Sequence, residues 1–97
     1  MATIDIRKSH ALSVDEAKQR AESFAKDMEG QMGIQWTWDT DGKIKFNAPS
    51  GAAKGASGFV TVSSADVRVE IDLPFLLRAI KGTIEGKVNE RLNKLLG

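Results

Sequence analysis

Side chains that could take part in catalysis are few in this sequence. It has no Cys and no Tyr, and its one histidine, His10, follows Ser9 at the end of an alternating segment. A general base must lie within hydrogen-bond reach of the group that it deprotonates. The spacing of Ser9 and Ser13 around His10 does not indicate a Ser-His-Asp arrangement. We therefore interpret His10 as a surface side chain and expect no catalytic residues and no enzymatic activity.

Two glycine-containing stretches resemble ligand-binding loops but lack essential residues. "DTDG" at 39–42 has the alternating carboxylates that open a calcium loop, but Lys43 follows where a further ligand is needed. In a phosphate-binding loop the lysine follows the second glycine, whereas Lys54 precedes Gly55. We therefore expect no metal and no cofactor, and we interpret 47–58 as a long flexible connection.

The first two elements follow from the spacing of the apolar residues. Residues 3–8 alternate between apolar and polar side chains, which predicts a half-buried strand. Ser13 and Glu16 have the spacing of a capping box. In this motif the serine hydroxyl accepts a hydrogen bond from the glutamate N–H, and the glutamate side chain accepts one from the serine N–H. The apolar residues that follow recur every three or four positions, and they predict an amphipathic helix that ends near Gly30 or Gly33.

The segment 34–47 is typical of a hairpin, and its register can be argued. A two-residue loop at 41–42 would pair apolar with polar side chains and mix the two faces. A three-residue loop at 40–42 keeps the apolar side chains on one face and places Gly42 where a left-handed residue is needed. This loop pairs Trp36 with Phe46 and Trp38 with Ile44.

Two further strands and a long helix are predicted in the second half of the chain. Across a turn near 64–65, Val60 and Val62 face Val69 and Val67, and the alternation continues to Leu73. Pro74 suits the first turn of a helix, which we predict to run to about Leu96. The apolar residues of this helix lie on one arc that faces the core: Leu77, Ile80, Ile84, Val88, Leu92 and Leu95.

These elements predict an α+β fold in the order β-α-β-β-β-β-α. Each strand is apolar on one face only, so the sheet has one covered and one open face. We therefore expect a two-layer sandwich, a mostly antiparallel sheet with two helices on one face. Residues 1–97 suffice for a single domain. The strand order stays open.

The two tryptophans lie in phase with the apolar face of the hairpin. We interpret Trp36 and Trp38 as core residues rather than as a platform for a base or an acyl chain. A helix lying over a curved sheet could also leave an apolar pocket, lined by these two residues with Ile80 and Ile84. Such a pocket would hold an acyl or hydroxyacyl group.

The overall charge is nearly balanced, with 14 Lys and Arg against 13 Asp and Glu. Little net field is left to attract a polyanion, and the open sheet face has Phe59 as its single aromatic candidate for base stacking. We therefore do not expect a nucleic-acid partner. The longest apolar run is far shorter than the roughly 20 residues that span a bilayer, and the N-terminus alternates where a signal peptide would be continuously apolar. These observations favour a cytoplasmic protein without a transmembrane segment.

Charge is divided unequally between the two predicted helices. Residues 78–96 hold five basic and two acidic side chains, a net charge of +3, whereas residues 15–29 hold three basic and five acidic ones, a net charge of −2. Two interpretations stay open. The charges complement the helix dipoles and solvate the surface, or the basic helix lies on an anionic or amphiphilic surface.

Gly82 and Gly86 lie one turn apart within the predicted C-terminal helix, although each costs roughly 1 kcal/mol relative to alanine. On the helical wheel they share a side with Phe75 and Ala79, opposite the core-facing arc. We predict that this small-residue stripe is an interface, which meets either the preceding helix or the same stripe of a second subunit. The alternative is that the glycines are tolerated in solvent.

The chain as a whole resembles a known family. The stretches that carry the resemblance are "IDIRKSHALSVDEAKQRAESFA", a "W-x-W" strand and "VRVEIDLPFLLRAIKGTIEGKVNERLNKLL", of which 67–85 is the most specific part. They are similar to those of the polyhydroxyalkanoic acid system proteins. The resemblance implies a bacterial protein encoded with genes for making, storing or using polyhydroxyalkanoate, in a family that includes granule-surface components. It supplies no catalytic residues.

Three hypotheses of function follow. The leading one is a non-enzymatic accessory protein of polyhydroxyalkanoate storage, cytoplasmic and granule-associated, that binds a protein partner or the granule surface. The alternative is a small-ligand binding module that holds an acyl or hydroxyacyl group between the sheet and the C-terminal helix. The third is an oligomerisation unit, such as a homodimer.

Overall fold

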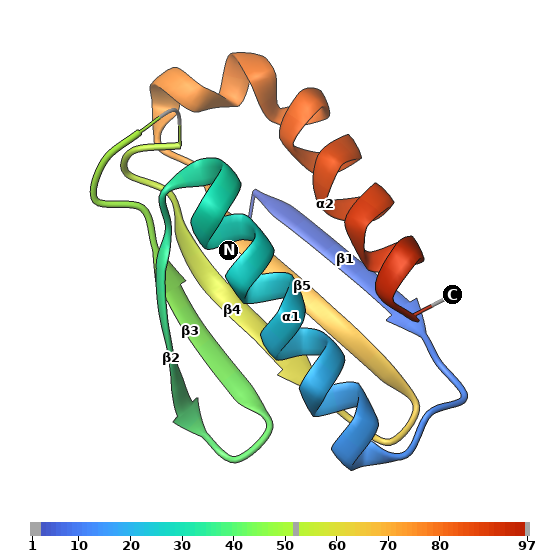
Figure 1. The fold of residues 1–97 in the computed structure, drawn as a ribbon. Coiled ribbons are helices and arrows are strands. Elements are labelled where there is room, and N and C mark those ends of the chain that lie inside the picture. The colour runs from blue at the N-terminus through green and yellow to red at the C-terminus, as the bar shows by residue number, and fades with distance from the viewer. Residues whose placement is uncertain (1–2, 52, 97) are drawn as a thin grey trace.

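An antiparallel sheet covered by two helices forms the fold (Figure 1), which a computed structural model describes for residues 3–51 and 53–96. The elements are β1 (Ile4–Ser9), α1 (Val14–Met32), β2 (Gln35–Thr40), β3 (Lys43–Asn47), β4 (Ser57–Val62), β5 (Asp66–Asp72), the 3₁₀ helix η1 (Phe75–Ile80) and α2 (Lys81–Leu96). Over the described residues the sheet has five strands in the order β1-β5-β4-β3-β2, with every neighbouring pair antiparallel. The predicted α+β sandwich and its element order are confirmed.

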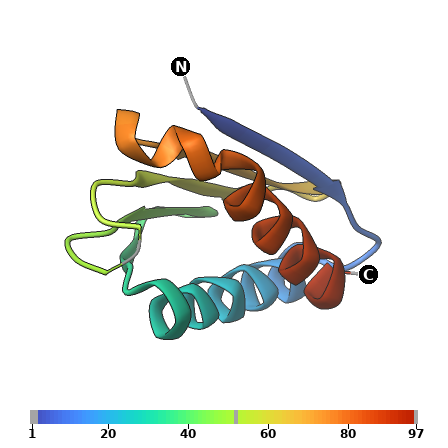
Figure 2. The ribbon, with the colours of Figure 1, turned by 90° about the horizontal axis from the view of Figure 1, so that it is seen from above.

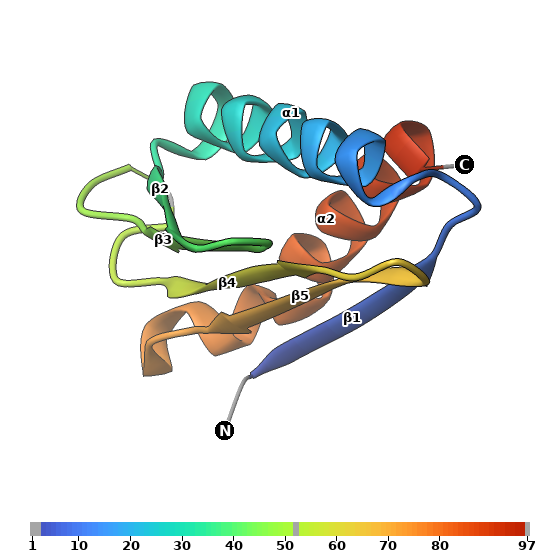
Figure 3. The same cartoon turned by 90° about the horizontal axis from the view of Figure 1, so that it is seen from below.

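Both helices lie on the same side of the sheet. Helix α1 packs near β4 and β2, whereas α2 crosses from the end of β5 along β1 (Figure 2). Seen from below, α1 forms a layer separate from the strands (Figure 3). The core is the space enclosed by these two layers, and the buried residues of α2 that face it are Ile84, Val88 and Leu92.

The ends of α1 have the Ser13 half of the predicted capping box and one of the predicted glycine caps. The Ser13 hydroxyl accepts a hydrogen bond from the backbone N–H of Glu16 at 3.2 Å. At the other end Gly33 has a φ of +70°, and its N–H donates to the carbonyl of Glu29. Of the two glycines proposed as the helix end, Gly33 is therefore the cap.

The β2–β3 hairpin has the predicted pairing but a different loop. Trp36 pairs with Phe46 and Trp38 pairs with Ile44. However, Thr40 still belongs to β2 and pairs with Lys43, so the loop is shorter than the three residues predicted. The extra residue is Asp39, where the register shifts in the manner of a β-bulge. Gly42 has a φ of +80°, as the left-handed position requires.

The connection between β3 and β4 is more ordered than the flexible linker that we predicted. Ser57 and Gly58 belong to β4, and the alanines 48, 53 and 56 are each at most 5% exposed. Backbone hydrogen bonds close the loop on itself, including one from Ala48 to the carbonyl of Ala56 at 2.8 Å. The alanines of this connection fill the end of the core. The amino-acid composition of the segment does not reveal this role.

The C-terminal helix differs from the single α-helix predicted from Pro74 to Leu96. The structure has a 3₁₀ helix over 75–80 and an α-helix only from Lys81. A 3₁₀ helix turns by about 120° per residue instead of 100°, so the apolar arc drawn for an α-helix does not hold in the first part. Ile80 was predicted to face the core, but it lies at the junction of η1 and α2 and is 45% exposed.

Candidate functional site

The largest exposed apolar side chains of the described chain gather in η1. Phe75 is 81% and Leu76 is 85% exposed, and Ile80 and Ala79 are exposed beside them. We call Phe75, Leu76, Ala79 and Ile80 the η1 patch. Large apolar side chains that are exposed at adjoining positions are typical of a surface that binds a protein, a membrane or a ligand.

The patch is held in place by residues on its inner side. Leu77 packs against the core, and its N–H donates to the carbonyl of Pro74 at 2.9 Å. Pro74 in turn lies against Gly55, where an added Cβ would come within 3.0 Å of the proline ring. The Arg78 guanidinium donates to the carbonyl of Leu73 at 3.4 Å. The β3–β4 connection and the end of β5 therefore fix the position of η1.

The 3₁₀ winding explains which side chains are left outside. With three residues per turn, residues i and i+3 lie one above the other. Leu77 packs against the core, and Phe75 and Leu76, the two residues before it, lie on the other two sides of the turn. Ile80 is at the junction with α2 and is partly exposed.

Basic side chains lie within and just after the η1 patch in the chain. Arg78, Lys81 and Lys87 are exposed, and none of them forms an ion pair with another residue in the described part of the chain. Over 75–87 they face one acidic residue, Glu85, which leaves a net charge of +2. Further along α2 the charges are neutralised, since Arg91 pairs with Asp27 and Lys94 with Glu90.

The predicted small-residue stripe is split by the structure. Phe75 and Ala79 lie in η1, and Gly82 and Gly86 are exposed in α2. An added Cβ at either glycine would have no atom of the described residues within 4 Å, so the stripe does not meet α1 as one version of the prediction had it. Helix α1 instead approaches the later turns of α2, where Arg20 donates to the carbonyl of Leu95 at 3.0 Å. The contact with a second subunit stays a prediction.

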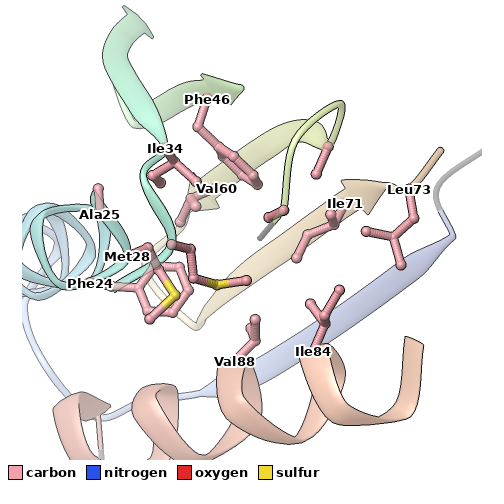
Figure 4. Close-up of a pocket in the computed structure, with 13 residues that line it drawn as sticks. Phe24, Ala25, Met28, Ile34, Phe46, Val60, Ile71, Leu73, Ile84 and Val88 are labelled. Carbon is pink, nitrogen blue, oxygen red and sulfur yellow. The ribbon is translucent and has the colours of Figure 1, made fainter. Parts of the chain in front are cut away.

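An apolar cavity of about 30 Å³ lies between the sheet and the helices (Figure 4). Of the four pocket residues predicted, Ile84 lines this cavity, together with Val88 and side chains of α1 and the sheet. Trp36 and Trp38 are half-buried against the core near the β2 edge, and the Trp36 Nε1 atom is buried without a hydrogen-bond partner among the described residues. Neither tryptophan lines this cavity; Trp36 and Trp38 each border a separate, more open hollow near β2. Ile80 is partly exposed and does not line the cavity either.

His10 has a structural role in the loops next to β1. Its Nδ1 atom accepts a hydrogen bond from the Leu12 N–H at 3.1 Å, so Nε2 carries the proton and donates to the Ser63 carbonyl at 2.9 Å. Both ring nitrogens are thus engaged in holding the end of β1 to the β4–β5 turn. Within residues 3–51 and 53–96, no group of three or more His, Asp or Glu side chains is placed to hold a metal ion.

The open face of the sheet carries paired charges. Arg68 donates from Nε and Nη2 to the two carboxylate oxygens of Asp5, at 2.9 and 2.7 Å. These hydrogen bonds lower the pKa of Asp5 and raise that of Arg68. Lys43 lies over the Phe59 ring, 4.3 Å from its centroid. Arg68, Asp5 and Lys43 thus find partners on this face.

Residues 4–96 match the family model described as "Putative polyhydroxyalkanoic acid system protein". No curated protein and no solved structure matches the chain. None of the helices in the described residues is long and apolar enough to span a membrane. Because the family model covers nearly all of the sequence, the chain belongs to the polyhydroxyalkanoic acid system protein family.

Proposed function

We propose that this protein is a non-enzymatic accessory component of bacterial polyhydroxyalkanoate storage, which acts by binding the granule surface or a protein located there. The observation that supports it most is the family match over 4–96. The exposed η1 patch provides a place for such contact, since Phe75 and Leu76 are left largely in solvent by the described fold.

The hydrogen bonds of His10 and the apolar lining of the cavity support the non-enzymatic part of the proposal. The imidazole of His10 is committed to two loop hydrogen bonds. The cavity is lined only by apolar side chains, so it offers no group for proton transfer or nucleophilic attack. A surface-binding role requires neither.

Cell fractionation tests the proposal. Bacteria that express the tagged protein are grown with and without polymer accumulation, and the granules are separated by density. We expect the protein in the granule fraction under accumulating conditions and in the supernatant otherwise, with an unrelated cytoplasmic protein as the control. A protein that stays in the supernatant under both conditions, and recovers no granule-bound protein in a pull-down, contradicts the proposal.

The second candidate, a module that binds an acyl or hydroxyacyl group, has a defined location in the apolar cavity beside Ile84. Its volume of about 30 Å³ is roughly a tenth of the smallest ordinary ligand pockets. Binding would therefore require the helices to move apart. A rise in melting temperature with 3-hydroxy acids or acyl-CoA supports this candidate, because a ligand of the folded state stabilises it, and no rise at millimolar ligand rejects it.

A further inference from the structure

We propose that the η1 patch docks on an anionic lipid surface. Phe75 and Leu76 would enter the apolar layer, while Arg78, Lys81 and Lys87 pair with the head groups. This inference rests on the proposed function, for which it names the binding residues and the chemistry of the surface.

The apolar half of the argument is the exposure of two adjoining large side chains. Phe75 and Leu76 are 81% and 85% exposed, far more than Val14, which is 37% exposed on α1. The 3₁₀ winding directs them to two neighbouring sides of the same turn. They adjoin in the first turn of η1, so one surface can contact both.

The position of η1 in the fold allows a lipid surface to reach it. It lies at one end of the molecule, beside the β3–β4 connection and beyond the last residue of β5 (Figures 1 and 3). Its inner side is fixed by Leu77 and Pro74. A preorganised segment loses little conformational freedom on binding.

The choice of a lipid surface that carries negative charge comes from the neighbouring cations. Arg78, Lys81 and Lys87 form no ion pair among the described residues, and neither do six other cations: Lys8, Arg20, Lys26, Lys43, Lys45 and Lys54. What distinguishes the three is their place next to Phe75 and Leu76 in the chain, in a segment, 75–87, whose one acidic residue is Glu85. An apolar insertion combined with unpaired basic side chains is the pattern of proteins that bind at a membrane interface. Each signal alone gives only weak binding.

A second copy of the chain fits the patch less well. Self-association through η1 would bring the same three cations of two molecules together, with Glu85 as the acidic residue of 75–87. Repulsion between these like charges favours the lipid over a second copy.

Vesicle co-sedimentation measures the predicted binding. The purified protein is mixed with vesicles of phosphatidylcholine alone, or of equal parts phosphatidylcholine and phosphatidylglycerol. We expect binding to the anionic vesicles that weakens at high salt, and much weaker binding to the neutral ones.

Two sets of variants separate the contributions. Phe75→Ser with Leu76→Ser should lower the affinity for anionic vesicles by about 100-fold, since burial of each large apolar side chain is worth about tenfold or more. Lys81→Gln and Lys87→Gln should each lower it about fivefold. The matched controls are Val14→Ser for the apolar change and Lys26→Gln with Lys45→Gln for the charge change, all at exposed positions outside η1 and α2.

Folding is checked by the melting temperature, which should stay unchanged because the substituted side chains are exposed. The inference is overturned if the wild type does not bind anionic vesicles or if the Phe75 and Leu76 variant binds as well as the wild type. It is also overturned if this variant converts a dimer to a monomer in light scattering, since a second copy then occupies the patch.

The granule experiment keeps the two proposals apart. If the wild type and the Phe75 and Leu76 variant both sediment with granules, the inference fails and the proposed function stands. If the wild type does not sediment with granules and recovers no granule-bound protein, the proposed function fails, and the vesicle assay still decides the inference.

Discussion

Substitution of the two α2 glycines by alanine should stabilise the protein. Gly82 and Gly86 lie inside α2, neither has a positive φ, and an added Cβ would meet no described atom within 4 Å. The expected gain is therefore the backbone entropy term alone, about 0.5–1 kcal/mol for each glycine. The double variant should gain about 1–2 kcal/mol in free energy of unfolding, which corresponds to roughly 4–16 °C in melting temperature for a domain of this size.

The assay is thermal and urea unfolding, followed by circular dichroism, with light scattering before each experiment. Gly30→Ala is the matched control, because Gly30 is an exposed glycine of α1 that also has no described atom within 4 Å of an added Cβ. It lies outside the Gly82 and Gly86 stripe. A similar or slightly smaller gain is expected there, since Gly30 is close to the end of its helix.

The reasoning is refuted if Gly30→Ala stabilises and the α2 variants do not. A fall in melting temperature for Gly82→Ala or Gly86→Ala, accompanied by a loss of molecular mass in light scattering, would show that the stripe contacts a second subunit. The dimer version of the interface prediction would then be correct.

Two further predictions concern the sheet. Gly58→Ala should lower the free energy of unfolding by roughly 1–3 kcal/mol in urea titrations, because an added Cβ would overlap the Glu70 carbonyl oxygen and lie 2.9 Å from the Phe46 ring; unchanged stability would show that β4 can shift. Asp5→Asn should weaken the acid dependence of stability. The Arg68 hydrogen bonds hold the folded-state pKa of Asp5 below its ordinary 3.8, so their contribution is present above that pH and lost as the pH falls through the lower folded value. Identical slopes of unfolding free energy against pH in wild type and variant would contradict this assignment.

The hairpin registers could be predicted because alternation carries the necessary information. Pairing Trp36 with Phe46 and Val60 with Val69 keeps apolar residues on one face, and a shift by one position would reverse every side chain. The strand order could not be predicted in this way. Alternation shows which face of β1 is buried but not which strand lies beside it.

The candidate site was predicted only in part. Phe75, Ala79, Gly82 and Gly86 were grouped as an interface from a helical wheel, and all four are exposed. The predicted contact of these residues with α1 is wrong. The helical wheel assumed one α-helix, whereas the chain forms η1 and α2. The unpaired state of Arg78 and Lys81 could not be foreseen either, since it depends on which carboxylates the fold brings near.

The pairing of β1 with β5 has a consequence for the order of folding. Asp5 and Arg68, which meet across these strands, are 63 positions apart in the sequence. During synthesis β1 and α1 emerge well before β5 exists, and the chain must close a long loop before this edge of the sheet can form. The hairpins β2–β3 and β4–β5 need only short closures. We therefore expect them to form early, with the docking of the N-terminal strand as a late step that completes the core beneath α2.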